Sequence, residues 1–275
     1  MRPLAQRVVL ATCSFLAIGS CVLKPREHPL DPTTLQGLLL SLYRPSAEQL
    51  PVSGVSFWTR ADDAVNQSGL TIWPDRSGFS STIAGPQIQV EGNRVNGRPA
   101  VLFPGSQPYR LDGLANQLIS NTFSVLVVFR NGTATPTGVN QAFVNVGSAV
   151  GGVEFGLDGA TERLILLKSN TLAMFTGVTV ISNTTAYNMS TLTYDASGNG
   201  IIYLNGASDV SGTNLQTFTN NGQITISGRT DDSEYFKGHI AEVIVFTRSL
   251  SAADRQSLEC YFSRRYAISV SFACS

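Results

Sequence analysis

From residue 55 onward the sequence is a succession of short β-type segments separated by turn residues, and this pattern limits the possible folds most strongly. Each segment is rich in β-branched and aromatic residues, and many are followed by Asn-Gly, Asp-Gly or Ser-Gly, which favour tight turns. The predicted strands are 55–58, 70–73, 88–90, 100–103, 123–130, 142–146, 153–157, 164–167, 189–194, 201–204, 223–227 and 240–246. Because no helices alternate with them, the pattern predicts an all-β protein, a two-sheet antiparallel β-sandwich.

The last of these segments runs into the only strong helical pattern of the domain. Residues 240–246 are apolar on both faces and contain one charge, Glu242, which indicates a strand covered on both sides. Ser251 is a good helix N-cap, and Asp254 follows three residues later. The sequence therefore predicts a short C-terminal α-helix, beginning after Ser251, that closes the β-rich body.

Composition and charge narrow the function classes. Charged residues make up 14% of the chain and hydrophobic residues 43%, so a sizeable core is available and intrinsic disorder is disfavoured. The formal net charge is zero and the basic residues are scattered, which argues against nucleic acid as a partner. We find no boundary within 55–268, so residues 53–275 are expected to form a single domain.

The N-terminus has the pattern of an export signal. Arg2 and Arg7 precede the apolar run 8–18, which is too short for a transmembrane helix. We interpret residues 1–20 as a signal peptide, and the Ile-Gly-Ser-Cys sequence ending at Cys21 resembles a bacterial lipobox. The alternative is an ordinary cleaved signal in which Cys21 is incidental or disulfide-paired.

Residues 21–52 are expected to form a tether. Prolines are spread through this segment, and residues 33–43 could form one short helix. A lipidated Cys21 would hold the protein on a membrane without a spanning helix. These features predict an exported protein of the bacterial cell envelope, at the outer membrane or the cell surface.

Several stretches together resemble the concanavalin A-like lectin/glucanase superfamily, and in particular laminin G-like jelly-roll domains of bacterial surface proteins. They are FWTRAD at 57–62, WPDRSG at 73–78, NGRPAVLFPG at 96–105, YLNG at 203–206, and the closing strand and helix at 236–266. The resemblance implies two antiparallel sheets, one of them concave, with variable loops at the rim. It implies little about function, because this fold hosts lectins, glycosidases, adhesion modules and spacers.

The chain departs from the family pattern at two positions. Phe79 follows Ser77-Gly78 where a small polar turn is common, and His239 precedes the final strand where many members carry Asp. Both departures weaken the case for a metal site or a sugar site inherited from the family.

Catalytic chemistry has little support in the sequence. Glycoside hydrolysis needs two carboxylates across the scissile bond, but Glu154 and Asp158 have Gly156 between them, and the acidic run 231–234 lies in a predicted turn. Only His239 lies in the domain, which gives no basis for a histidine metal site or a Ser-His-Asp triad. We predict that the protein is not an enzyme.

Other conspicuous residues are more readily explained by architecture. We expect Trp58 and Trp73 to pack in the sheets, and His239 to be a partly exposed strand residue. Because burying a lone carboxylate is costly, Glu242 is expected to be a structural group paired with an arginine such as Arg98.

Candidate binding residues lie in the predicted loops. Aspartates could hold a calcium ion at the rim, the alternative being that they cap turns; the candidates are Asp62, Asp75, Asp231 and Asp232. Aromatic residues could stack on a sugar ring, and the candidates are Phe79, Tyr109 and Tyr235.

Two cysteines remain at the C-terminal end. In an exported chain Cys260 and Cys274 are expected to form a disulfide that pins the tail onto the closing helix.

The sequence thus predicts a non-enzymatic, lipid-anchored surface protein whose domain binds carbohydrate, or an extracellular, matrix or envelope protein, through rim loops. Two alternatives stay open: a structural envelope component without a soluble ligand, and an unusual glycoside hydrolase.

Overall fold

The computed structural model describes residues 49–79, 82–106, 109–114, 121–133, 135–169, 172–182, 184–219 and 222–274. All of them belong to one compact unit, residues 43–275. The signal segment 1–20, Cys21 and the tether up to residue 48 lie outside the described residues, so what the sequence predicts for them stays a prediction.

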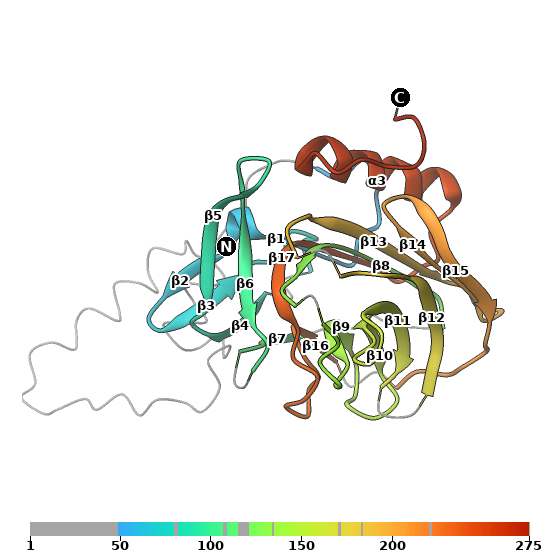
Figure 1. Cartoon of the computed structure of the whole chain (residues 1–275), viewed down its shortest axis with the longest axis horizontal. Helices are drawn as coiled ribbons and strands as arrows, with labels where there is room; N and C mark the ends of the chain where they lie inside the picture. Colours follow the sequence, from blue (N-terminus) through green and yellow to red (C-terminus); the bar gives the residue numbers. More distant parts are fainter. Residues whose placement is uncertain are drawn as a thin grey trace, which may run out of the picture. The chain divides into compact units, whose positions relative to one another are not determined.

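Two antiparallel sheets form the body of this unit, as the sequence predicted (Figure 1). The eight-stranded sheet follows the order β15 (Ala207–Thr213), β14 (Asn199–Leu204), β13 (Asn188–Tyr194), β8 (Phe123–Asn131), β17 (Lys237–Phe246), β6 (Arg98–Pro104) and β5 (Gln89–Val95), with β1 (Phe57–Arg60) also paired to β17. The nine-stranded sheet follows the order β12 (Leu172–Val180), β11 (Arg163–Lys168), β10 (Val153–Leu157), β9 (Gln141–Val146), β16 (Gln223–Ile226), β7 (Leu111–Leu114), β4 (Ile83–Pro86), β3 (Leu70–Trp73) and β2 (Val65–Gln67). A short 3-10 turn, η1 (Ala61–Asp63), follows β1.

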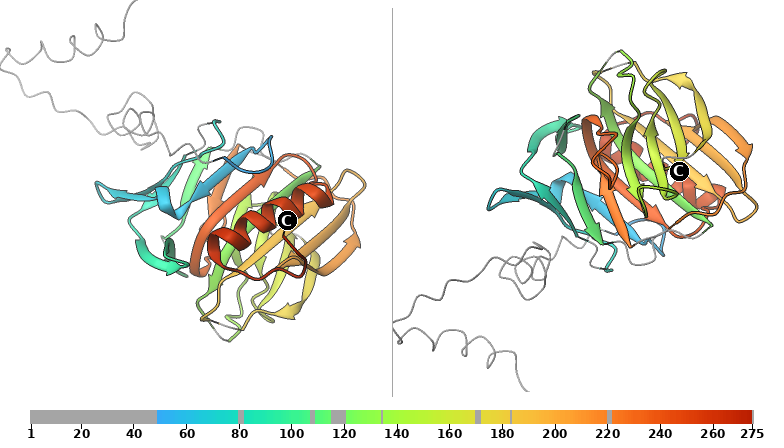
Figure 2. Two further views of the ribbon diagram at one scale, coloured as in Figure 1. Left: turned by 90° about the horizontal axis from the view of Figure 1, so that it is seen from above. Right: turned by 90° about the horizontal axis from the view of Figure 1, so that it is seen from below.

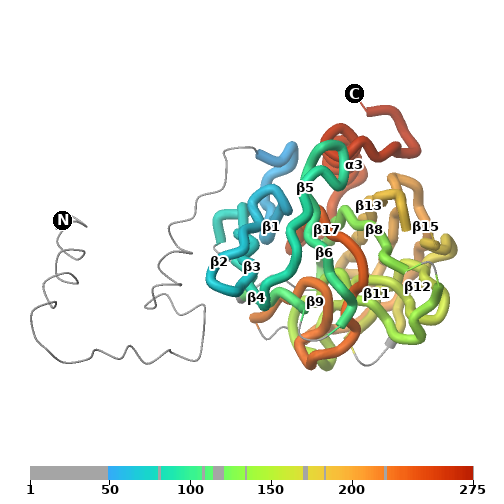
Figure 3. The backbone as a smooth tube through the Cα atoms, turned by 60° about the vertical axis from the view of Figure 1, so that its left-hand side comes forward, coloured from blue at the N-terminus to red at the C-terminus, as the bar shows by residue number. Residues whose placement is uncertain are grey.

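The central strands β8 and β17 are buried on both faces. In β17, Val243 and Val245 point into the space between the sheets, whereas Ile244 and Phe246 point to the opposite face. That alternation follows from the two-residue period of a strand. Strand β17 pairs with β6 and β8, which lie far from it in the sequence (Figure 3).

The helix α3 (Ala252–Tyr266) covers the outer face of the eight-stranded sheet (Figure 2). Leu258, Phe262 and Tyr266 of the helix pack there against the strands and form a second apolar core. Ser251 is the N-cap, since its hydroxyl accepts a hydrogen bond of 3.1 Å from the Asp254 amide. The predicted closing helix is therefore confirmed.

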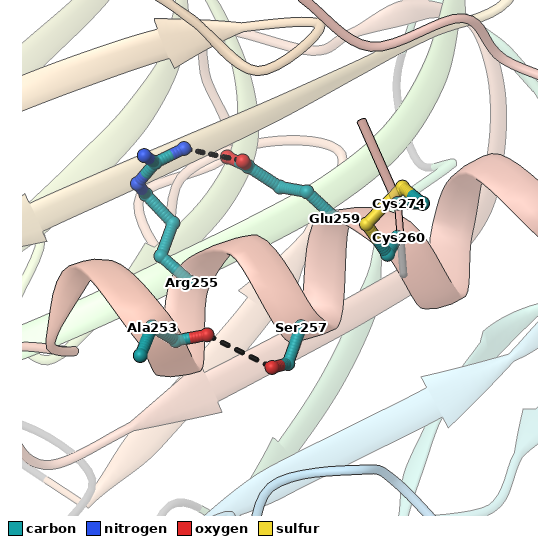
Figure 4. Close-up of a disulfide and its surroundings, with 6 residues drawn as sticks. All are labelled: Ala253, Arg255, Ser257, Glu259, Cys260 and Cys274. Carbon is teal, nitrogen blue, oxygen red and sulfur yellow. Dashed lines mark hydrogen bonds and ion pairs between the residues drawn. A yellow bond between two sulfur atoms is a disulfide. The ribbon is translucent and has the colours of Figure 1, made fainter. Parts of the chain in front are cut away.

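A disulfide joins Cys260 in α3 to Cys274 in the C-terminal tail, as predicted (Figure 4). The two Cα atoms are 5.5 Å apart. On the same helix Arg255 forms an ion pair with Glu259, and the Ser257 hydroxyl donates to the carbonyl of Ala253. The bridge fixes the last residues of the domain to its closing helix.

Every strand predicted from the sequence is present, with ends that differ by a few residues. Five further strands were not predicted: β2, β4, β7, β12 and β15. Strands β2, β12 and β15 are at the ends of their sheets, where side chains need not be apolar. Strands β4 and β7 contain glycine, and β4 ends at a proline, which masks the β pattern.

Across the described part of the chain, no helix combines the length and the hydropathy needed to cross a membrane.

Candidate functional site

The connection between β16 and β17, which we name the 228–235 loop, lies beside the beginning of β9. The amide of Ala142 in β9 donates to the Glu234 carbonyl at 2.8 Å. Within the loop, the Arg229 amide donates to the Ser233 carbonyl at 2.9 Å, which closes a hairpin. Asp232 and Glu234 have left-handed backbones, with φ of 60° and 57°.

Arg110 ties this loop to β7. Its guanidinium donates to the Asp112 carboxylate at 2.9 Å and to the Asp232 carboxylate at 2.6 Å. It also donates to the Arg229 carbonyl at 2.8 Å. The Tyr235 hydroxyl donates to the same Asp232 carboxylate at 2.9 Å. Burial and this contact with Asp232 raise the pKa of Tyr235 to about 12.

Arg229 links the acidic groups of the loop to one another. It is buried, donates to Glu234 at 2.9 Å and forms an ion pair with Asp231. The adjacent guanidinium lowers the pKa of Asp231. The loop is therefore built around a buried cation with two carboxylate partners.

Glu154 lies on β10, which pairs with β9 next to this loop. Its neighbours Val153 and Phe155 point into the core, so Glu154 projects to the outer face of the nine-stranded sheet. It is only 1% exposed. Burial, together with the nearby Glu234 carboxyl, raises the pKa of Glu154 well above its ordinary value.

The sequence did not predict the contact between Glu154 and Glu234. Paired carboxylates were expected on one strand, whereas this pair combines a strand residue with a loop residue. The only signal in the sequence is a single carboxylate inside the otherwise apolar strand 153–157. Nothing in the sequence specifies its partner.

A groove of about 270 Å³ opens beside the loop. It lies where the chain leaves β6 and enters β9 and β17, so it belongs to the rim of the sandwich. We name it the rim groove; its polar and aromatic lining residues are Thr137, Asn140, Gln141, Glu234, Tyr235 and Lys237. The groove thus combines one aromatic ring with several hydrogen-bonding groups.

A second cavity, of about 390 Å³, lies next to α3. Two of its lining arginines, Arg98 and Arg265, already form ion pairs with Asp62 at 3.1 Å and 2.6 Å. Gln49, the first described residue, also lines this cavity. We therefore consider the rim groove the better candidate site.

The structure separates the binding candidates predicted from the sequence. Asp231, Asp232 and Tyr235 come together in the 228–235 loop, and Tyr109 is the chain neighbour of Arg110 and packs partly against the core. Phe79 is 65% exposed and does not line the rim groove.

The other two predicted aspartates lie outside this loop. Asp62 pairs with arginines beside α3, and the Asp75 carboxylate accepts from the amides of Trp58 and Ser77 at 3.0 Å and 2.8 Å. Among the described residues, no three His, Cys, Asp or Glu side chains are grouped so that they could hold a metal ion. The calcium site stays a prediction.

The structural role expected for Glu242 is correct, but its expected partner is wrong. Glu242 is fully buried between β17 and α3 and faces Arg265 at 3.5 Å, whereas Arg98 pairs with Asp62. It accepts hydrogen bonds from Trp58 Nε1 at 2.6 Å and from Tyr266 Oη at 2.6 Å. The sequence cannot show that α3 supplies these partners, because this depends on how the helix packs.

The prediction that His239 is partly exposed is wrong: the residue is 4% exposed. Its Nδ1 accepts from Arg130 at 2.9 Å, because a guanidinium can only donate. Nε2 therefore carries the proton and donates to Glu91 at 2.9 Å. Trp58 and Trp73 are both buried, as expected.

Solved structures support the same architecture. The chain resembles the binding domain of botulinum neurotoxin serotype G, with 17% identity and a TM-score of 0.56 over 76% of this chain and 51% of that one. It also resembles domain 4 of an extracellular arabinanase from Geobacillus stearothermophilus, solved with arabinotriose, with 19% identity and a TM-score of 0.56 over 75% and 98% of the two chains.

A third similar structure is the binding domain of botulinum neurotoxin DC in complex with SialylT, with 17% identity and a TM-score of 0.54. The match covers 75% of this chain and 51% of the neurotoxin DC chain. The chain thus spans about half the length of these neurotoxin domains. At such identities the likeness establishes the jelly-roll fold alone.

No curated protein matches the sequence. The family model described as the concanavalin A-like lectin/glucanases superfamily, of laminin G type, matches residues 114–254, slightly more than half of the chain. This range contains most of both sheets, the 228–235 loop and the beginning of α3. The chain therefore belongs to the concanavalin A-like lectin/glucanase superfamily.

Proposed function

We propose that the protein binds carbohydrate, without enzymatic activity, through the rim groove. The observation that carries the proposal is the composition of the groove wall. The Tyr235 ring offers an apolar face to a sugar, and Asn140, Thr137 and Glu234 offer groups that pair with hydroxyls. Two of the similar structures were solved with sugars, arabinotriose and SialylT, which agrees with this choice.

The size of the groove favours a short contact. A volume of about 270 Å³ is slightly below the range of about 300–1,000 Å³ that is usual for ligand sites. The groove would therefore hold the end or a short stretch of a glycan rather than an extended polysaccharide. Tyr235 is suited to such a role because Arg110 and Asp232 fix its position.

Binding of purified protein to a glycan array tests the proposal. We expect a small set of related glycans to bind. A blank array would contradict the proposal, and stoichiometric capture of an envelope protein in its place would favour the structural alternative. Release of sugars from a panel of polysaccharides would contradict the non-enzymatic part.

We further propose that the protein is exported and anchored in the cell envelope through a lipidated Cys21. The support is the charged and apolar signal pattern of residues 1–20 and the lipobox-like sequence. Growth with a palmitate analogue should label the wild-type protein and not Cys21→Ser. Equal labelling of the two proteins would contradict lipidation.

A further inference from the structure

Three buried oxygen atoms next to the 228–235 loop have no hydrogen-bond donor among the residues that the structure describes. They are both carboxylate oxygens of Glu154 and Oε2 of Glu234, and all of them are shielded from solvent. The other oxygen of Glu234 accepts from Arg229. Since an unpaired buried carboxylate oxygen is costly, the arrangement needs a donor that the neighbouring side chains do not supply.

A single proton would satisfy two of these three oxygens, one as the donor and one as the acceptor of the same hydrogen bond. Ionised carboxylates only accept hydrogen bonds, whereas a protonated carboxyl group donates one. Strand β9 pairs with β10, which carries Glu154, and its Ala142 amide donates to the Glu234 carbonyl; the Glu234 carboxyl is, after burial, the neighbour that raises the pKa of Glu154 most. A proton held between them therefore converts two repelling acceptors into a hydrogen-bonded pair.

The charges around the pair favour retention of this proton. From the loop, Arg229 and Asp231 face Glu154, and from the strands on either side its cross-strand neighbours are the neutral Asn145 and Leu167. The single positive charge of Arg229 is shared by the carboxylates of Asp231 and Glu234. Ionisation of Glu154 would add a further buried negative charge beside Arg229, which already pairs with two carboxylates.

The next charged groups on the outer face of the nine-stranded sheet do not neutralise this excess of negative charge. Arg110 pairs with Asp112 and Asp232, and Tyr235 donates to Asp232. Arg110 is thus engaged by two other carboxylates. The local charge remains negative even when Glu154 is neutral.

The backbone of the loop depends on such side-chain contacts. Asp232 and Glu234 have φ values of 60° and 57°, in the left-handed region that non-glycine residues rarely occupy, and so does Ser227 just before the loop, with φ of 65°. Each such residue costs free energy and persists only where its surroundings hold it. Loss of the contact between Glu154 and Glu234 would therefore remove one of the contacts that hold this strained backbone in place.

We propose that a proton shared by Glu154 and Glu234 latches the 228–235 loop onto the nine-stranded sheet and so makes the rim groove sensitive to pH. The loop supplies Glu234 and Tyr235 to the groove wall. When the pH rises and the proton leaves, the two carboxylates repel, the loop opens and the wall is lost. The claim that pH regulates ligand binding in the groove rests on the proposed function. The latch itself needs no ligand.

Amide hydrogen exchange of the full-length protein tests the latch. Peptides covering 228–235 are followed from about pH 5 to about pH 9, the range in which buried glutamates titrate, with correction for the intrinsic exchange rate. In the wild-type protein we expect protection of the loop to fall at least about tenfold as the pH rises. In Glu154→Gln the amide donates the same hydrogen bond without a charge, so protection should persist over the whole range.

Two further variants complete the design. Glu234→Gln places the amide on the other partner and should also flatten the profile. Glu259→Gln changes a buried carboxyl on the helix side and should keep the wild-type profile. The latch would be overturned if protection of the wild-type loop did not change with pH. It would also be overturned if Glu154→Gln and Glu234→Gln both lost protection with rising pH as the wild type does.

The latch and the proposed function can fail separately. A blank glycan array with a pH-dependent loop would overturn carbohydrate binding and support the latch. Glycan binding with a flat exchange profile would overturn the latch and support the function.

Discussion

Truncation of Glu242 should strongly destabilise the contact between α3 and the eight-stranded sheet. The carboxylate is fully buried and accepts from Trp58 at 2.6 Å, Tyr266 at 2.6 Å and Tyr261 at 3.1 Å. Glu242→Ala leaves these donors without an acceptor, and each buried unsatisfied group costs about 1–3 kcal/mol. Because Tyr261 lines a cavity and can find water, we expect a total loss of about 3–5 kcal/mol.

Equilibrium urea denaturation measures this loss as a change in the free energy of unfolding. Asp254→Ala is the control, because its ion pair with Arg248 is exposed and should contribute less than about 1 kcal/mol. A loss below about 1 kcal/mol for Glu242→Ala would refute the reasoning, because it would mean that the buried donors find other partners.

The pH dependence of Glu242 gives a second readout. Burial raises its pKa from 4.5 to about 7, although the surrounding donors oppose the rise. The folded state therefore holds this proton more tightly than the unfolded state, so stability is lost as the pH rises from about 4.5 to about 7. Relative to Glu242→Gln, the wild-type protein should lose about 3 kcal/mol over this interval. Parallel stability profiles of the two proteins would contradict the assignment.

Two further predictions follow from single contacts. Replacement of both Cys260 and Cys274 by Ser opens a link between residues 14 apart and should lower the free energy of unfolding by about 3 kcal/mol; equal denaturation midpoints for the double variant and the wild type would contradict this. Burial, with Arg130, lowers the pKa of His239 despite Glu91, so the folded state holds this residue neutral and stability should fall as the pH drops below about 6.5. Thermal melting should show that fall weakened in His239→Gln, and an identical fall in both proteins would count against it.

Most of the fold could be predicted from the sequence, because its central strands are buried on one or both faces and therefore carry a clear apolar pattern. Residues 240–246 had to be apolar on both sides, since α3 covers one face and the second sheet the other. Edge strands carry no such requirement. Strand β15 has mostly exposed or half-buried residues, and its Ser and Gly residues read as a loop.

The candidate site was less predictable, because it depends on register and on loop conformation. Tyr235 and Asp232 were identified as loop residues of interest, but only the structure shows that Arg110 holds them together. Glu154 and Glu234 meet because β9 lies next to β10 and also contacts the 228–235 loop. A pairing between segments that far apart has no signature in a single sequence.

The position of His239 and the partners of Glu242 have the same explanation. A polar residue in a buried strand signals that partners must exist, because an unpaired buried polar group is costly. It does not identify them. Arg265 and Tyr266 become partners of Glu242 through the packing of α3.

Calorimetric titration of Tyr235 variants with the tightest glycan from the array tests the central claim most directly. The claim is that the rim groove binds the sugar and that the Tyr235 ring is its apolar contact. Tyr235→Ala should bind at least about tenfold more weakly, as expected for an aromatic anchor. Tyr235→Phe should retain most of the affinity, and Phe79→Ala, which alters an exposed ring that does not line the groove, should bind as the wild type does. Unchanged affinity in Tyr235→Ala, or loss of binding in Phe79→Ala, would contradict the claim.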